Sequence, residues 1–202
     1  MNSEGKCSAK VVGILLAAGA SSRLGQPKQL LPFQGKPLVR RVAEAALASR
    51  LVKLIVVVGN QAAAVADALE GLPAELVENA DFLQGQSTSL RAGVAALPAD
   101  LDAALVLLVD QPFVDAALID RLIDQFESSG APMVAPEHAG QRGNPVLFAA
   151  VLLPEFAAIT GDVGARDVIR RHREQLSTVP LEDARAFMDV DTWEDYERVS
   201  RS

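Results

Sequence analysis

Residues 14–31 combine an apolar run, a loop of small residues and two cations, a pattern suited to binding phosphates. Gly19 and Gly25 lack a Cβ, so the backbone N–H groups of the loop can approach a phosphate chain closely. Arg23 and Lys28 supply two positive charges to a ligand that carries several negative ones. The loop is therefore predicted to hold a nucleoside triphosphate, with both cations acting in catalysis. The nucleotide-binding residues expected in this stretch are Leu16, Ala17, Ala18, Gly19, Ser21, Ser22 and Gly25.

Two better-known phosphate loops do not fit this stretch. A Walker A loop ends in Gly-Lys-Ser/Thr, whereas Gly25 is followed by a Gln-Pro-Lys run. A dinucleotide-binding loop reads Gly-x-Gly-x-x-Gly, whereas the residue two positions after Gly19 is Ser21. The remaining alternative is an ordinary strand-to-helix turn whose small residues serve the turn alone. That alternative leaves the spacing of the two cations unexplained.

Carboxylates at two places in the chain suggest a metal site. Asp110 follows the apolar run 104–109, and ligands of open parallel sheets bind beyond the carboxyl ends of the strands. Asp189 and Asp191 project to the same side of an extended segment, where they repel each other unless a cation or water intervenes. Carboxylate oxygens are the hard ligands that Mg²⁺ prefers, and this ion usually bridges protein to phosphate. We therefore expect Mg²⁺ to bind Asp110 together with Asp191 or Asp189.

Helix capping is the alternative role for these acidic positions. Asp115 is better placed than Asp110 to cap a helix that starts near residue 116. Thr192 and Asp195 have the spacing of a capping box for the last helix, a role that leaves Asp191 free for a metal.

Residues 85–93 offer hydrogen-bonding groups to a planar base, because a glycine is followed by an amide and three hydroxyls at a helix start. Gln86, Ser87 and Ser89 are the predicted base-binding residues. Simple capping, with Ser87 or Thr88 as the N-cap, is the alternative.

Other chemistry finds little support in the sequence. His138 and His172 are far apart and lack Cys or His neighbours, which argues against zinc. A hydrolase triad is not expected, because the sequence has no Gly-x-Ser-x-Gly motif. The segments 142–145 and 161–166 are both Gly-rich with a cation, and each is explained equally well as an ordinary turn.

Strand and helix patterns alternate along the chain, which predicts a mostly parallel sheet in a three-layer α/β/α sandwich. The predicted strands are residues 11–16, 54–58, 75–77, 104–109 and 133–135. The predicted helices between them are residues 38–49, 62–69, 89–97 and 116–128. After residue 136 we expect an extended segment or hairpin arm at 141–148, helices at 151–158 and 165–172, a strand at 177–179 and a terminal helix.

Length and charge narrow the class of protein further. The 202 residues suit one domain, and the net charge of −7 argues against nucleic-acid and anionic-membrane partners. The single cysteine, Cys7, excludes a disulfide within the chain and fits a reducing compartment. Residues 1–10 lack the apolar core of a signal peptide and are expected to be disordered. These features predict a soluble, cytoplasmic protein.

The motifs together resemble the nucleotidyltransferases of the molybdenum cofactor cytidylyl- and guanylyltransferase family. The family signature runs Leu-Ala-Ala/Gly-Gly, two small residues, Arg, Met or Leu, Gly, and then Pro/Asp-Lys, and the resemblance extends from Val11 to Val199. It implies a Rossmann-like domain of the nucleotide-diphospho-sugar transferase type, in which residues 137–188 form a small acceptor-binding lobe. The acceptor-binding residues it implies are Arg142, Gly143, Asn144, Gly164 and Arg166.

The resemblance also implies a reaction and its partners. In that reaction, molybdopterin bearing molybdenum attacks a nucleoside triphosphate with the help of Mg²⁺, and pyrophosphate leaves. Guanylyl relatives tend to carry Leu-Ala-Gly-Gly where this loop has Ala18. Gln111 and the segment 86–89 also favour the cytidylyl branch. The implied donor is CTP, and the product is a cytosine dinucleotide cofactor for molybdenum hydroxylases. The expected protein partner is a molybdenum hydroxylase or its chaperone. Two residues depart from the family pattern, Leu24 in place of Met and Thr88 in place of Ser.

Three alternatives stay open from the sequence. A guanylyltransferase would use the same loop and metal site with GTP. An NAD(P)H-dependent oxidoreductase would use the same loop and turn over its cofactor without metal. A non-catalytic carrier of molybdopterin would keep the segments around Gly143 and Gly164 but lose Asp110 or Lys28, and both of these are present.

Overall fold

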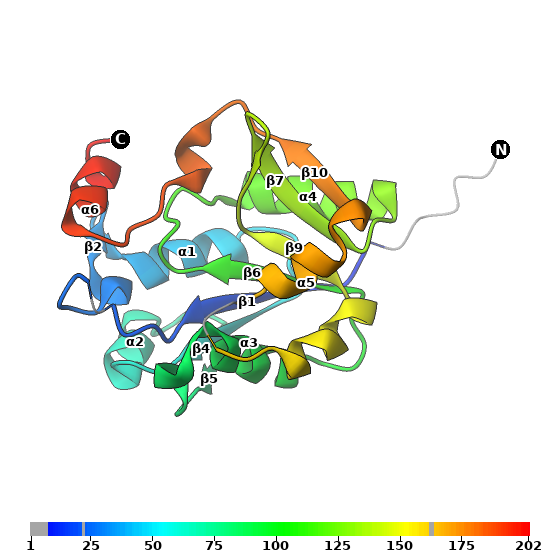
Figure 1. The fold of residues 1–202 in the computed structure, drawn as a ribbon. Helices are drawn as coiled ribbons and strands as arrows, with labels where there is room; N and C mark the ends of the chain where they lie inside the picture. The colour runs from blue at the N-terminus through cyan, green and yellow to red at the C-terminus, as the bar shows by residue number, and fades with distance from the viewer. Residues whose placement is uncertain (1–7, 22, 162–163) are drawn as a thin grey trace.

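A mostly parallel β-sheet forms the centre of the computed structural model, which describes residues 8–21, 23–161 and 164–202 (Figure 1). Strand β9 runs antiparallel to both of its neighbours. In order across the sheet, the strands are β10 (Leu176–Pro180), β7 (Met133–His138), β9 (Val146–Ala149), β6 (Ala103–Leu108), β1 (Val11–Ala17), β4 (Lys53–Val58) and β5 (Glu75–Glu78). The remaining short strands are β8 (Gln141–Arg142), which pairs with β7, and the hairpin of β2 (Pro32–Phe33) and β3 (Lys36–Pro37).

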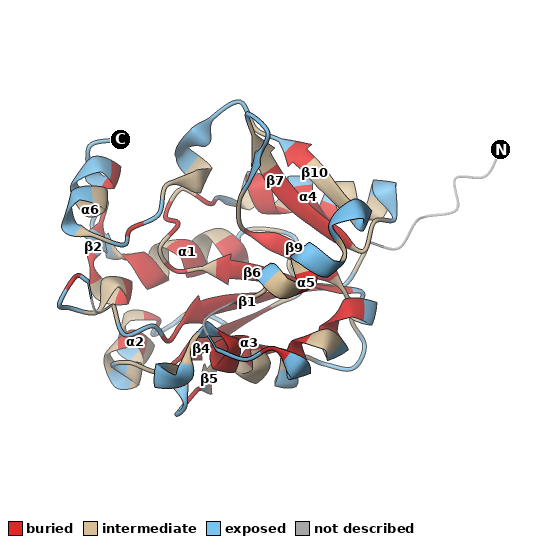
Figure 2. Cartoon of the chain, in the orientation of Figure 1, coloured by how far each residue is buried: buried red, intermediate tan, exposed pale blue. Residues whose placement is uncertain are grey.

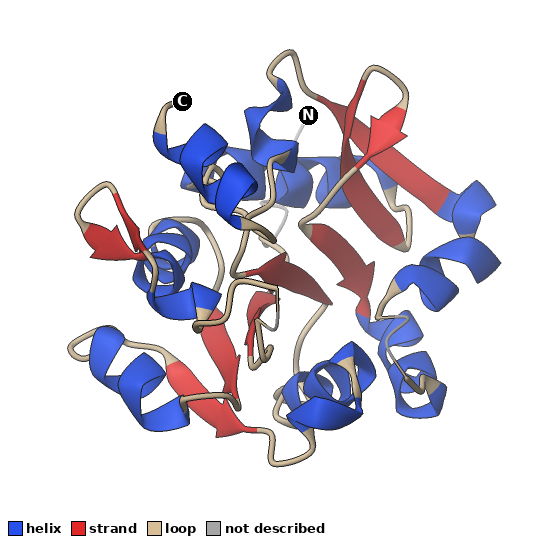
Figure 3. Ribbon diagram, turned by 60° about the vertical axis from the view of Figure 1, so that its left-hand side comes forward, coloured by secondary structure: helices blue, strands red, loops and turns tan. Residues whose placement is uncertain are grey.

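Helices cover both faces of the sheet (Figure 3). Every residue of β1 is buried (Figure 2), and its side chains alternate between the two faces. Val11 and Leu15 pack with one layer of helices, whereas Ile14 and Leu16 pack with the other. The first layer contains α1 (Leu38–Leu47), α2 (Ala62–Ala68) and α4 (Ala116–Ser129), and the second contains α3 (Gln86–Ala95), the 3-10 helix η3 (Ala150–Ala158) and α5 (Arg166–Arg171). The predicted three-layer α/β/α sandwich is therefore confirmed.

A smaller apolar cluster joins the C-terminal segment to the predicted phosphate loop, which lies between β1 and Lys28. Leu24 and Phe33 pack there with Val190 and Val199, and Val199 belongs to α6 (Trp193–Ser200). The hydroxyl of Tyr196 donates to the carbonyl of Pro32, which ties α6 to the β2–β3 hairpin. These contacts bring the Asp-Val-Asp segment beside the loop, although Asp191 lies 163 positions after Lys28 in the chain.

Helix starts follow the capping pattern in two places. Asp115 accepts a hydrogen bond from the Leu118 N–H at the start of α4, and Thr192 with Asp195 forms the predicted capping box of α6. The other short 3-10 helices are η1 (Lys28–Leu30), η2 (Phe82–Gln84), η4 (Arg173–Gln175) and η5 (Ala184–Phe187).

Several elements differ from the sequence prediction. Helix α3 begins at Gln86, three residues earlier than expected. Residues 151–158 form a 3-10 helix, whose interior Pro154 has no N–H to donate. The segment 141–148 divides into β8 and β9, and the β2–β3 hairpin has no counterpart among the predicted elements.

The segment 137–188, expected to form a small acceptor lobe, is built into the same domain. Strand β9 lies between β6 and β7, and β10 forms an edge of the central sheet. Its role in acceptor binding stays a prediction. At the other end of the chain, residues 1–7 lie outside the described residues, whereas the Ala9 and Lys10 N–H groups donate to Glu127 and Asp102. No helix in the described part of the chain is long and apolar enough to cross a membrane.

Candidate active site

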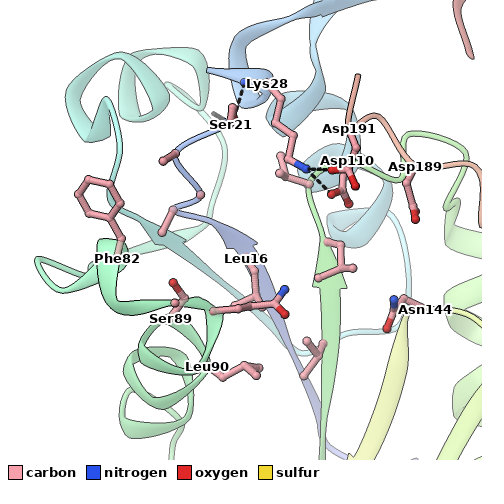
Figure 4. Close-up of a pocket in the computed structure, with 18 of the residues that line it drawn as sticks. Leu16, Ser21, Lys28, Phe82, Ser89, Leu90, Asp110, Asn144, Asp189 and Asp191 are labelled. Carbon is pink, nitrogen blue, oxygen red and sulfur yellow. Dashed lines mark hydrogen bonds and ion pairs between the residues drawn. The ribbon is translucent and has the colours of Figure 1, made fainter. Parts of the chain in front are cut away.

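A cavity of about 900 Å³ opens at the carboxyl ends of β1 and β6, beside the start of α3 (Figure 4). Most of the residues singled out from the sequence line its wall, although they come from segments far apart in the chain. Those residues are Leu16, Ala18, Gly19, Ser21, Arg23, Lys28, Gln86, Ser89, Asp110, Asn144, Arg166, Asp189 and Asp191.

The other predicted residues lie away from the wall or outside the description. Ala17 and Ser87 are fully buried. Gly25 has φ +68°, a left-handed backbone that favours glycine, so it shapes the loop's turn. Gly164 lies against the Gln86 side chain, whose Oε1 would be 2.3 Å from an added Cβ. Ser22 lies outside the described residues.

Lys28 lies between two of the predicted metal-binding carboxylates. Its Nζ is 2.5 Å from Asp110 Oδ2 and 2.8 Å from Asp191 Oδ1 (Figure 4). The side chains of Lys28 and Asp110 are only 15% and 16% exposed, so water screens this pair weakly. Burial lowers the pKa of Lys28, but the two carboxylates outweigh it and hold the pKa above its ordinary value. Lys28 is therefore a fixed positive charge at neutral pH.

Asp189 has a different partner from Asp191. Gln111 Nε2 donates to Asp189 Oδ1 at 2.7 Å. Burial, followed by repulsion from Asp110, raises the pKa of Asp189, and the Gln111 amide offsets only part of this. Because folding raises this pKa, the ionised carboxylate destabilises the fold at neutral pH, and acid removes the cost by protonating it.

The carboxylates suit a divalent cation whose remaining coordination positions are filled by phosphate and water oxygens. Asp110 Oδ1 is buried and has no hydrogen-bond partner, so this oxygen is left available for a cation. Asp110 and Asp191 already share one positive charge, that of Lys28. Among the described residues, no three His, Cys, Asp or Glu side chains converge into a metal site by themselves. Mg²⁺ commonly binds through one or two carboxylates plus phosphate and water oxygens, which matches such a partial set.

Gln29 fixes the shape of the phosphate loop, a role that the sequence pattern does not reveal. Its side chain is fully buried, and Nε2 donates to the carbonyls of Ala17 at 2.9 Å and Gly19 at 2.7 Å. The Ser21 hydroxyl in turn accepts the Lys28 backbone N–H at 3.0 Å. The loop is therefore held from within, and its cavity-facing side stays free for a ligand.

We expect Gln29→Met to destabilise the protein by about 1–3 kcal/mol, because two loop carbonyls lose their buried donor. The KM for the triphosphate should rise as well, since the loop loses its fixed shape. Chemical denaturation and steady-state kinetics measure the two effects. Gln26→Met is the matched control, because Gln26 is exposed on the same loop. Unchanged stability in Gln29→Met would remove this role.

A buried network positions the predicted base-binding segment. Asn79 Nδ2 donates to Thr88 Oγ1 at 2.8 Å and to Ser89 Oγ at 3.0 Å, and Thr88 is bonded to the Gly85 carbonyl. The capping interpretation of Ser87 or Thr88 is wrong, because Gly85 is the N-cap of α3 and no side chain caps it. Ser89 lines the cavity, whereas Ser87 faces the interior with an unpaired hydroxyl. Asn79 could not be found from the sequence, because it is a single asparagine at the end of β5.

The predicted acceptor-binding residues of segments 142–145 and 161–166 lie only partly on the cavity wall. Asn144 and Arg166 line the cavity. Arg142 pairs in register with Glu137 across the β7–β8 hairpin, away from the cavity wall. The ring of Phe187 lies over Gly143, where an added Cβ would come within 2.1 Å of it. A close approach to Phe187 therefore explains the glycine at 143 without any ligand.

The fold and the site define the class of protein. A mostly parallel α/β sandwich carries a small-residue loop, a lysine and carboxylates around one cavity, and the domain is a nucleotidyltransferase. The chain belongs to the family of the MobA-like NTP transferase domain, whose model matches residues 13–176. The resemblance found in the sequence motifs is thereby confirmed at the level of the family.

Relatives within this family carry different names. The chain is 34% identical to nicotine blue oxidoreductase of Paenarthrobacter nicotinovorans, over 94% of this chain and 96% of that protein. It is 30% identical to a probable molybdenum cofactor guanylyltransferase of Natronomonas pharaonis, over 92% and 95% of the two chains. The crystal structure of Rv0371c from Mycobacterium tuberculosis superposes with a TM-score of 0.86 at 29% identity, covering 96% of this chain and 100% of that one. A second structure of Rv0371c is a complex with manganese, with a TM-score of 0.83 at 28% identity over 96% of this chain and 99% of that one.

Proposed function

We propose that this chain transfers CMP from CTP to molybdopterin bearing molybdenum, giving molybdopterin cytosine dinucleotide and pyrophosphate. The observation that carries the proposal is the convergence of Lys28, Asp110 and Asp191 at one end of a cavity of about 900 Å³. That volume lies at the upper end of the range of small-molecule sites, as two substrates require. The related guanylyltransferase of Natronomonas pharaonis supports a molybdenum cofactor substrate. A molybdenum hydroxylase or its chaperone would then receive the product.

The reaction needs positioning and charge rather than a general base. An oxygen of the acceptor phosphate forms a bond to the α-phosphorus of the triphosphate, and the bond from that phosphorus to the bridging oxygen breaks. The electron pair of the broken bond leaves with pyrophosphate. The attacking oxygen is already ionised at neutral pH, so the chain's task is to align it and to offset charge. Lys28 and Arg23 offset the charge that develops on pyrophosphate, while Asn144 and Arg166 hold the acceptor.

Mg²⁺ would be held by Asp110 and Asp191 and would supply charge neutralisation between the α-phosphate and the leaving group. We favour Asp191 over Asp189 because Asp191 shares Lys28 with Asp110, whereas Asp189 accepts from Gln111. The manganese complex of Rv0371c supports a divalent ion in this fold.

We expect the protein to prefer CTP to GTP by roughly tenfold or more, because one or two mismatched buried hydrogen bonds cost a few kcal/mol. Ala18 is among the residues that line the cavity. Guanylyl relatives tend to carry Gly at this position, and we propose that the methyl group leaves less room for a purine. Competing the two triphosphates in one assay, with molybdopterin present, measures the preference. Ala18→Gly should reduce the preference for CTP over GTP while leaving the metal requirement unchanged. Equal incorporation, or a preference for GTP, would move the chain to the guanylyl branch.

An oxidoreductase is the second candidate, because the named relative with 34% identity over nearly the whole chain is nicotine blue oxidoreductase. Such an activity would use the phosphate loop for NAD(P)H and would not need the carboxylates. Cofactor oxidation in excess chelator, without release of pyrophosphate from any triphosphate, would establish this alternative. Metal-dependent release of pyrophosphate would exclude it as the main activity.

A further inference from the structure

The Lys28 ammonium stands where a cation between Asp110 and Asp191 would be bound. It contacts one oxygen of each carboxylate, at 2.5 and 2.8 Å. Figure 4 shows the Lys28 side chain extending to both carboxylates. A divalent ion placed between the same carboxylates would lie a few ångströms from this ammonium, and like charges at that distance repel strongly where water is scarce.

Lys28 is also the main charge that balances this acidic cluster. Burial is the main cause of the raised pKa of Asp189, and repulsion between Asp110 and Asp189 is the next. Arg23 lies 3.7 Å from Asp191, but its side chain is 74% exposed, so it neutralises little.

We infer that Lys28 is the resident cation of the metal site while no nucleotide is bound, and that it exchanges with a divalent ion brought in by the triphosphate. The inference rests on the proposed function, because it uses the same metal ligands and the same phosphate-binding role of Lys28. It adds an order of binding: the ion alone competes with Lys28 and binds weakly, whereas the triphosphate offers Lys28 new anionic partners and frees the carboxylates.

The loop geometry permits this exchange by side-chain rotation alone. The Lys28 backbone N–H donates to Ser21 Oγ at 3.0 Å, and Gln29 next to it is buried and bonded to the loop carbonyls. The backbone at this position is therefore fixed. The flexible four-carbon stem of lysine carries the charge, and both Lys28 and the phosphate loop line the same cavity.

Binding of Mn²⁺ to the nucleotide-free protein tests the exchange. Lys28→Met removes the ammonium and keeps most of the stem, so it should bind Mn²⁺ at least roughly tenfold more tightly than the wild type. Lys36→Met is the matched control, because Lys36 is an exposed lysine of β3 that pairs with Glu44 away from the site. The Mn²⁺ affinity of this variant should equal that of the wild type. Adding Asp110→Asn to Lys28→Met should abolish the gain, which would place the ion at this site. The free Mn²⁺ signal in electron paramagnetic resonance gives the affinities.

The same Mn²⁺ measurement can contradict the exchange. A folded Lys28→Met protein that binds Mn²⁺ no more tightly than the wild type would overturn the exchange, whether both proteins bind the ion or neither does. Lys28→Gln provides the same comparison if the methionine variant does not fold. Failure of the proposed function would appear separately, as wild-type protein that releases no pyrophosphate from any triphosphate. The Mn²⁺ comparison uses no nucleotide and stays decisive in that case.

Discussion

Asp110→Asn should lower turnover by about 10³-fold or more while leaving the protein folded. The substitution keeps the shape of the side chain and removes the charge that is expected to hold the divalent ion. Only the charge difference then separates the variant from the wild type. The rate of pyrophosphate release at saturating triphosphate, followed over a range of Mg²⁺ concentrations, measures the effect.

The stability of Asp110→Asn tests whether the lost rate comes from the site. The variant loses the ion pair with Lys28, but Lys28 keeps Asp191 as a partner, and Asp189 loses a repelling neighbour. These opposing effects should leave the free energy of unfolding within about 1 kcal/mol of the wild type. Asp115→Asn is the matched control, because asparagine caps a helix as well as aspartate does, so α4 and activity should both survive. Activity that persists in Asp110→Asn, or in excess chelator, would exclude the metal role.

The sequence predicted the parts of the fold that follow from local pattern. Continuous apolar runs such as β4 and β6 gave strands buried on both faces, and Asp115 and Thr192 gave helix starts, because each signal lies within a few residues. The small residues between β1 and Lys28 likewise predict a phosphate loop from spacing alone, and phosphate binding by this loop stays a prediction.

Contacts between distant segments could not be predicted in this way. Nothing near Gln29 or Asn79 in the chain shows that their amides hold the loop and the start of α3. From the sequence, Lys28 was predicted to contact phosphate and no protein group. In the fold it also contacts Asp191, which lies 163 positions later in the chain. At Gly143 the fold supplies a packing reason for the glycine, the nearby ring of Phe187, which the sequence could not show, and its predicted role in acceptor binding stays a prediction.

Lys28→Ala should slow turnover by about 10²–10³-fold, because a charge that offsets the developing pyrophosphate is lost. Triphosphate binding should weaken as well. From the sequence alone the fold is expected to survive this substitution, since a lysine on a loop packs little. The structure adds that the Lys28 side chain is only 15% exposed and pairs with two carboxylates, so some loss of stability is expected as well.

We therefore expect Lys28→Ala to unfold more easily, by about 1–3 kcal/mol without ligand, because Asp110 is left buried and unpaired. A divalent ion should restore part of this lost stability, because it can pair with the Asp110 carboxylate in place of Lys28. The same ion should stabilise the wild-type protein less. Denaturant unfolding with and without Mg²⁺ measures the restoration, and Lys36→Ala controls for the loss of an exposed, ion-paired lysine elsewhere. A Lys28→Ala protein with wild-type rate would remove Lys28 from the chemistry. Unchanged stability would mean that the ion pairs with Asp110 and Asp191 contribute nothing to the fold.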